Sequence, residues 1–280
     1  MNTVYALLSA LLPFDWLEPT FMKNAFLAVL VACPLFGILG TVVVSNRMAF
    51  FSDAIGHSAL TGIALGVILG IRDVTLSMLV FSLLLGFVII SVKIKGKASA
   101  DTIIGVFSST SVALGIVLLS STGNFAKYQR YLVGDILSIR PQEIVLLLCS
   151  GVLLVAVWIV FYNQMLLTSM HPVFAKSRGI RTFVIEQIFA LLTAAIVTVS
   201  IRWTGLLVIN SLLVLPAAAS RLVSSSSRQY TLVSVLVSFA SGITGLVLSY
   251  YVGGASGAAI VIVNAVLFAL CLIFSLVKKR

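Results

Sequence analysis

Nine apolar runs, each about twenty residues long, follow one another along this chain. A run of about that length is what an α-helix needs to cross a hydrocarbon core roughly 30 Å thick. The runs cover residues 24–46, 48–70, 74–92, 102–121, 143–162, 183–201, 203–222, 230–251 and 256–276. At Arg47 and at Arg202 almost no loop separates two runs, so one broken or tilted helix is an alternative there. The sequence therefore predicts an all-α fold, a polytopic integral membrane helix bundle with eight or nine transmembrane helices.

The composition leaves no room for a separate soluble domain. Charged residues make up only 9% of the 280 residues, against roughly 25% in a soluble globular domain. No polar stretch approaches the roughly 50 residues that a domain needs. We therefore expect a single transmembrane domain over residues 1–280. Residues 1–12 are apolar but lack the basic start of a cleavable signal peptide, so we expect them at the membrane interface.

The net charge of +10 comes from short basic clusters between the apolar runs, as in cytoplasmic loops, and we expect no nucleic-acid partner. If the C-terminus is cytoplasmic and every run crosses once, the N-terminus lies outside. Twelve of the 18 basic residues then fall on the cytoplasmic side: Arg47, Lys93, Lys95, Lys97, Lys176, Arg178, Arg181, Arg221, Arg228, Lys278, Lys279 and Arg280. This arrangement satisfies the positive-inside rule.

Two acidic residues, Asp53 and Glu186, and one histidine, His57, fall within or at the edge of an apolar run. A charged carboxylate near the centre of a membrane helix costs about 2.5 to 3.5 kcal/mol on insertion scales, so such a residue is by default a functional hypothesis. Asp53 and His57 stand four residues apart, which places both side chains on one helix face. Glu186 stands near the start of its run, where a helix N-terminus favours an anion, and we expect a structural role for it.

Carboxylate and imidazole together suit borderline divalent cations such as zinc, manganese and iron. Counted from Arg47, His57 lies about 15 Å into the membrane, close to its middle. The sequence thus predicts a metal site at Asp53 and His57, and leaves open which metal it takes. The alternative is a structural pair in which the two side chains bond only to each other.

Three glycines follow this pair at every fourth residue: Gly62, Gly66 and Gly70. Small residues at that spacing allow close helix approach. Gly62 lies about 140° around the helix from His57, so the helix can pack on one face and present its ligands on another. The pattern is compatible with packing inside the chain and with dimerisation.

Residues 52–62, with the sequence SDAIGHSALTG, closely resemble the SDAISHAVLPG-like segment of the permease subunits of ABC importers for zinc, manganese and iron. The resemblance implies that Asp53 and His57 belong to the metal path. Gly56 replaces the usual Ser and Thr61 the usual Pro, which suggests a different bend after the ligands. Four further segments resemble that family in the same order: residues 104–108, 131–137, 213–221 and 256–261.

This resemblance implies a multi-pass permease of the cytoplasmic (inner) membrane, in contact with lipid. It also implies three protein partners: a separate ATP-binding-cassette ATPase subunit, an extracytoplasmic metal-binding protein and a second copy of the chain in a homodimer. The divalent metal is then the transported substrate, and no permanently bound cofactor or enzymatic activity is expected. The chain itself has no G-x-x-x-x-G-K-[ST] sequence, so it cannot hold ATP by that phosphate-binding loop.

Residues 170–180, with the sequence MHPVFAKSRGI, resemble the family's cytoplasmic segment FDPEFARALGI. The resemblance implies a short helix that docks on the ATPase. The residues expected at that interface are His171, Pro172, Phe174, Ala175, Gly179 and Ile180. His171 and Val173 stand where acidic residues are common, so no salt bridge is carried over from the family. The alternative is a solvated basic loop.

Two other function classes use the same residues. In a secondary metal or proton-coupled transporter, Asp53 and His57 would form a proton relay. The energy source separates this alternative from ATP-driven import. A membrane-embedded metallohydrolase would be expected to carry an H-E-x-x-H pair, and the only two histidines, His57 and His171, are too far apart to form one.

Overall fold

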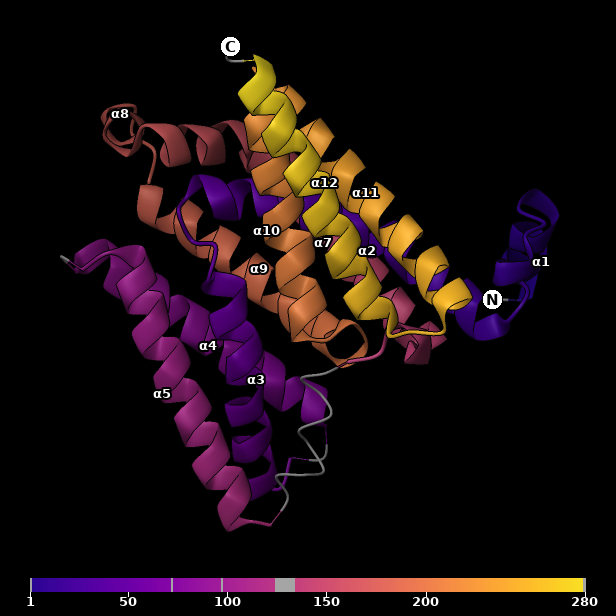
Figure 1. Ribbon diagram of the computed structural model, residues 1–280. Helices are drawn as coiled ribbons and strands as arrows, with labels where there is room; N and C mark the ends of the chain where they lie inside the picture. The colour runs from indigo at the N-terminus through magenta and orange to yellow at the C-terminus, as the bar shows by residue number, and fades with distance from the viewer. Residues whose placement is uncertain (1, 72, 97, 124–133, 279–280) are drawn as a thin grey trace. The chain divides into compact units, whose positions relative to one another are not determined.

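The computed structural model describes residues 2–71, 73–96, 98–123 and 134–278 (Figure 1). Over these residues the regular structure is helical throughout, without a strand, which confirms the all-α prediction. The α-helices are α1 Asn2–Leu11, α2 Thr20–Ser45, α3 Phe51–Ile68, α4 Val74–Lys95, α5 Ala100–Ser121, α7 Pro141–Met170, α8 Pro172–Ser177, α9 Thr182–Thr204, α10 Leu206–Val223, α11 Ser227–Val252 and α12 Ser256–Lys278. Two short 3-10 helices, η1 Asp15–Leu17 and η2 Ile136–Ser138, complete the described elements.

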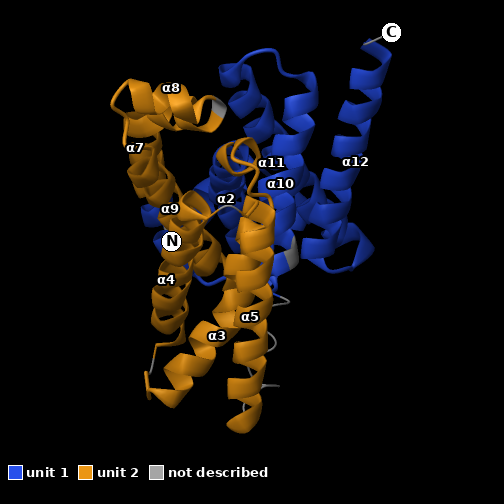
Figure 2. Cartoon of the chain, turned by 90° about the vertical axis from the view of Figure 1, so that its left-hand side faces the viewer, with its two compact units in different colours: residues 1–41, 134–151, 203–280 blue, residues 42–133, 152–202 orange. Residues whose placement is uncertain are grey.

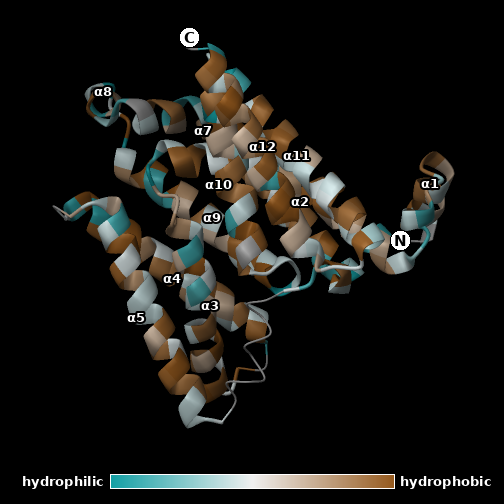
Figure 3. Cartoon of the chain, viewed as in Figure 1, coloured by the Kyte–Doolittle hydropathy of each residue, from teal (hydrophilic) through white to brown (hydrophobic). Residues whose placement is uncertain are grey.

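Eight helices in the described parts of the chain are long and apolar enough to cross a membrane: α2, α3, α4, α5, α7, α9, α11 and α12. Figure 3 shows hydrophobic residues along most of their length and hydrophilic residues around α8. The remaining predicted run, residues 203–222, contains α10, which counts as a shorter apolar helix. The predicted number of eight or nine spans is therefore matched by eight long helices and one shorter helix.

Both tight junctions are breaks between helices. Arg47 adopts the left-handed conformation, with φ of 54°, in the turn between α2 and α3. The other break lies three residues beyond Arg202, because α9 continues to Thr204. Gly205 follows with φ of 78°, a value that glycine tolerates without steric cost, and α10 begins at the next residue.

Side-chain caps fix where several helices begin. The Asp73 carboxylate accepts hydrogen bonds from the first backbone N–H groups of α4, at 2.9 Å and 3.3 Å. Ser99 caps α5 and Ser226 caps α11 in the same way. These groups satisfy backbone donors that have no partner inside a helix. They explain why polar residues directly precede the apolar runs.

The first of two compact units contains residues 1–41, 134–151 and 203–280 (Figure 2, blue). Here α10, α11 and α12 pack on one another, and small residues bring their backbones close. A Cβ on Gly245 of α11 would lie 2.5 Å from the Cα of Ile260 in α12. Ser234 of α11 donates a 2.9 Å hydrogen bond to the Gly37 carbonyl of α2. Close backbone contact and interhelical hydrogen bonds are the usual means of packing helices in lipid.

The second unit contains residues 42–133 and 152–202, including α3, α4, α5, α8 and α9 (Figure 2, orange). It carries all the predicted site residues. Lys97, Lys279, Arg280 and residues 131–133 of the resembling segment lie outside the described residues. The single domain over residues 1–280 remains a prediction.

Candidate functional site

The predicted metal ligands lie on one face of α3. Asp53 is in the first turn of the helix, where the positive end of the helix dipole favours an anion. His57 follows one turn later, and its Nε2 lies 3.6 Å from Asp53 Oδ1. This separation is longer than an ordinary hydrogen bond. The predicted juxtaposition is therefore confirmed, and its geometry differs from that of a tightly bonded structural pair.

The surroundings set these two residues apart from the rest of the helix. Between Phe51 and Ala64, every residue of α3 is buried except Asp53 and His57. Their side chains are 36% and 33% exposed. Over these residues the helix is thus open only where it carries an oxygen and a nitrogen donor.

The glycines of α3 pack against α4. A Cβ on Gly62 would lie 2.9 Å from the Cα of Met78, and one on Gly66 would overlap the Ser77 side chain. Gly70 has φ of 69° and follows the end of the helix. The contacts of Gly62 and Gly66 favour packing inside the chain over dimerisation as the reason for the glycine spacing.

Thr61 binds α3 to α5 on another side. Its hydroxyl donates a hydrogen bond to the Ser111 carbonyl, and the Ser111 hydroxyl lies 3.4 Å from Thr61 Oγ1. The helix continues without a break to Ile68, so the threonine at the usual proline position does not interrupt it. Contacts with α4 and α5 therefore hold the helix that carries Asp53 and His57.

A metal ion at this pair needs further ligands. No group of three or more His, Cys, Asp or Glu residues lies together in the part of the chain that the structure describes. Asp53 and His57 would therefore be two ligands of a larger set. Water, carbonyl oxygens or the same two residues of a second copy are the remaining sources.

The predicted docking segment forms the short helix α8. His171 is its N-cap and Pro172 occupies the first turn, where a missing backbone N–H costs nothing. Gly179, with φ of 77°, follows the end of the helix. The Arg178 guanidinium lies over the Phe174 ring, 4.8 Å from its centroid. The segment thus contains the predicted short helix, and its docking on the ATPase stays a prediction.

Its predicted contact residues divide into two groups. His171, Pro172, Phe174 and Gly179 are exposed, and Ile180 is half-buried. Ala175 is fully buried, so including it in the ATPase interface needs correction: its methyl group packs inside this chain.

Val173 was not among the predicted contact residues. Its side chain is 81% exposed, next to the exposed Phe174. The two adjacent apolar side chains lie at the surface of a six-residue helix, and their order in the sequence could have suggested Val173 as a further candidate contact residue.

Glu186 has a different partner from the predicted one. It lies beyond the first turn of α9, which contains no acidic residue. Instead of the helix N-terminus, the Lys93 ammonium of α4 neutralises it, with 2.8 Å between Nζ and Oε2. The expected structural role thus takes the form of an ion pair between helices. Sequence spacing gave no sign of it, because 93 residues separate the partners.

The model of the ABC 3 transport family matches residues 18–275 of the chain. Among similar proteins, the high-affinity zinc uptake system membrane protein ZnuB of Haemophilus influenzae is 30% identical over 92% of this chain and 97% of its own length. The manganese import system permease protein ScaB of Streptococcus gordonii is 29% identical over 89% of each chain. A solved chain of PsaBC from Streptococcus pneumoniae, in complex with Fab, is 26% identical with a TM-score of 0.77, covering 97% of this chain and 95% of that one.

Proposed function

This chain belongs to the ABC 3 transport family, and we propose that it is the permease subunit of an ATP-binding-cassette importer that carries a divalent transition metal across the cytoplasmic membrane. The observation that carries this proposal is the burial pattern of α3: between Phe51 and Ala64, only Asp53 and His57 are not buried. Zinc and manganese are the favoured substrates because the names of the similar permeases specify these metals. Iron has no comparable support.

The two side chains would act as successive or joint ligands of the passing ion. The Asp53 carboxylate supplies an oxygen and compensates the charge of the metal, whereas the neutral His57 imidazole supplies a nitrogen. A permeation site must bind well enough to admit an ion and weakly enough to release it. Two protein ligands on one turn of a helix, completed by exchangeable ones, meet both requirements.

Energy for transport would come from a separate ATPase subunit that docks on α8. Val173 and Phe174 present the exposed apolar surface for this contact, and the buried Ala175 seats the helix on this chain. We further propose an extracytoplasmic metal-binding protein as donor of the ion and a homodimer as the working form. In such a dimer, two Asp53 and two His57 side chains together provide two oxygens and two nitrogens, a set that zinc or manganese accepts.

Transport in reconstituted vesicles tests the function. The chain together with its ATPase should accumulate Zn²⁺ or Mn²⁺ only when ATP is supplied on the ATPase side. The matched control is the chain alone under an imposed proton gradient, where no uptake is expected. Gradient-driven uptake by the chain alone would instead establish the secondary transporter, with Asp53 and His57 as its relay.

Metal analysis of the purified complex tests the shared site. One ion bound for every two permease chains, lost on substitution of Asp53 by Ala, is the expected result. One ion in every chain would show that each copy completes its own site with water or carbonyl oxygens.

A further inference from the structure

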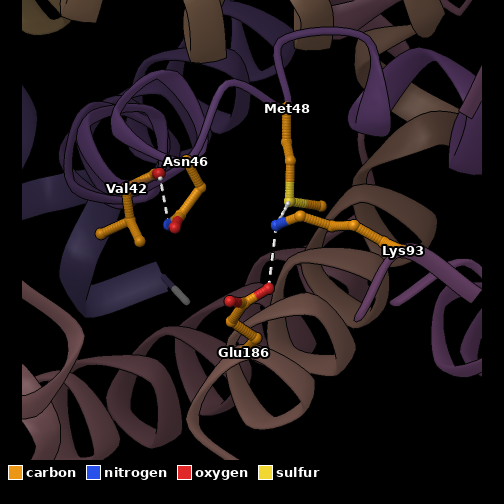
Figure 4. Close-up of polar contacts among 5 residues, drawn as sticks. All are labelled: Val42, Asn46, Met48, Lys93 and Glu186. Atoms are coloured by element: carbon orange, nitrogen blue, oxygen red, sulfur yellow. Dashed lines mark hydrogen bonds and ion pairs between the residues drawn. The ribbon is translucent and has the colours of Figure 1, made fainter. Parts of the chain in front are cut away.

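An ion pair joins helices α4 and α9 within the second unit, separate from the Asp53 and His57 pair. Lys93, near the end of α4, lies with its Nζ 2.8 Å from Glu186 Oε2 of α9 (Figure 4). The two side chains are only 19% and 15% exposed. If one partner of a shielded pair is removed, the other charge is left uncompensated at a high cost in free energy. The two side chains are therefore held strongly together.

The same ammonium also reaches the turn before α3. Lys93 Nζ lies 3.4 Å from the sulfur of Met48, a side chain that is almost fully buried. The Met48 carbonyl accepts the hydrogen bond from the Phe51 N–H, at the first residue of α3. Asp53 follows two residues later. Lys93 therefore connects Glu186 to the start of the helix that carries the metal ligands.

On its other side, the pair is connected to α8 through a short linker. The Ile180 N–H bonds to the Ala175 carbonyl at 3.1 Å, and the Ile185 N–H bonds to the Arg181 carbonyl at 3.2 Å. Glu186 is the next residue of α9. Because consecutive hydrogen bonds span the linker, a displacement of α8 carries the beginning of α9 with it.

A second contact keeps α9 and α4 in register beside the ion pair. The Gln187 amide donates 3.0 Å hydrogen bonds to the Phe87 carbonyl and to the Ser91 hydroxyl, both on α4. Because this contact does not involve Lys93 or Glu186, we expect the two helices to stay associated when the ion pair is removed.

We propose that Lys93 and Glu186 are positioning residues that transmit the movement of the docking helix α8 to the metal-binding start of α3. This inference rests on the proposed function, because it needs an ATPase bound to α8. The path runs from α8 through the linker to Glu186, from Glu186 to Lys93, and from Lys93 through Met48 to the first turn of α3. Neither residue touches the metal.

The test uses the complete complex with its ATPase in vesicles, with Mn²⁺ as the probe. The variants are Lys93→Met, Glu186→Gln and the charge exchange K93E/E186K. Lys95→Met is the matched control, because Lys95 is an exposed cation in the same last turn of α4. Three quantities are measured for each variant: co-purification of the ATPase, ATP hydrolysis, and Mn²⁺ uptake per ATP hydrolysed.

Both single variants should retain the ATPase and its hydrolysis, whereas uptake per ATP should fall about tenfold, within the range of typical coupling free energies. The charge exchange re-forms the ion pair but places a carboxylate beside the Met48 sulfur, so the ratio should stay low, and Lys95→Met should leave it unchanged. A wild-type ratio in the single variants would overturn the proposal, and so would a charge exchange that restores the ratio, because the ion pair alone would then be sufficient. If the single variants lose the ATPase and the exchange regains it, the pair serves assembly, which also overturns it.

A separate measurement tests whether the ATPase docks on α8. Phe174→Asp in the same preparation should release the ATPase. If the ATPase stays bound to Phe174→Asp, the docking surface lies elsewhere, whatever the ratio measured for Lys93 and Glu186.

Discussion

The two polar pairs of the second unit, Asp53 with His57 and Lys93 with Glu186, differ in their separation, in their exposure and in the helices they come from. Asp53 and His57 lie one turn apart on a single helix, 3.6 Å from each other, with about a third of each side chain exposed. Lys93 and Glu186 come from two helices, lie 2.8 Å apart and are more deeply buried. The first pair, called the open pair below, presents a carboxylate and an imidazole side by side. In the second, called the closed pair below, the Glu186 carboxylate already faces the Lys93 ammonium.

This difference indicates which of the two pairs can bind a metal ion. A carboxylate that already faces a lysine ammonium at 2.8 Å has its charge compensated within the chain. A metal ion that binds Glu186 would have to displace the Lys93 ammonium. A carboxylate beside an imidazole, on a helix segment where only these two side chains between Phe51 and Ala64 are not buried, offers an oxygen and a nitrogen donor to an added cation. The open pair therefore suits binding, and the closed pair suits holding helices in place.

The largest expected effect tests the open pair, through substitution of one of its two predicted metal ligands, Asp53 or His57. Asp53→Ala and His57→Ala should each abolish metal uptake while the protein still inserts and binds its ATPase, because neither substitution removes apolar helix surface. Uptake of radioactive or fluorescent-reporter metal by reconstituted vesicles measures this. Asp101→Ala, at an exposed carboxylate in the first turn of α5, is the matched control and should transport normally. Normal uptake by either ligand variant would remove the basis for treating the pair as a metal site.

A second test concerns α8, to which the closed pair is connected. Phe174→Asp places a charge in the exposed apolar surface of the helix and should detach the ATPase, which affinity purification measures. Phe14→Asp, at an exposed phenylalanine on the predicted outer side, is the control and should leave the complex intact. Co-purification in normal amounts with Phe174→Asp would assign the contact to another loop.

A smaller effect sharpens the chemical description of the open pair. Asp53→Cys replaces a hard oxygen donor by a soft thiolate, so the preference should shift toward zinc over manganese while total transport falls. Competition uptake with both ions gives the ratio. Asp53→Ser, which keeps an oxygen of similar size, should not raise the zinc preference. An unchanged zinc-to-manganese ratio in an active Cys variant would mean that Asp53 does not touch the metal at the selective step.

The smallest expected effect concerns the packing that holds α3. Thr61→Ala removes the hydrogen bond to the Ser111 carbonyl of α5 and should lower the free energy of unfolding by about 0.6 kcal/mol, the average for such bonds between membrane helices. Denaturant unfolding in detergent measures the change. Thr244→Ala is the control, because the Thr244 hydroxyl bonds only to the Ala240 carbonyl of its own helix. Equal losses in both variants would show that the contact with α5 adds nothing.

Sequence patterns predicted most of what depends on one helix at a time. The long apolar runs indicated the spans, because a helix in lipid must be apolar over a fixed length. The spacing of Asp53 and His57 predicted their shared face, because helical periodicity is local. The resemblance of residues 170–180 to a docking segment led to a helix at the right place, although the side of α8 that Ala175 occupies did not follow from it.

What the sequence alone determined is thus the helical class, the approximate spans and the placement of two candidate metal ligands one turn apart on one helix face. Only the tertiary structure decided that residues 51–64 of α3 are buried except at those two side chains, that Gly62 faces α4, and that Lys93 meets Glu186 across 93 residues of chain. The physical reason is that periodicity states which residues share a face. It carries no information on which other helix covers that face, because that choice depends on the packing of all the helices together.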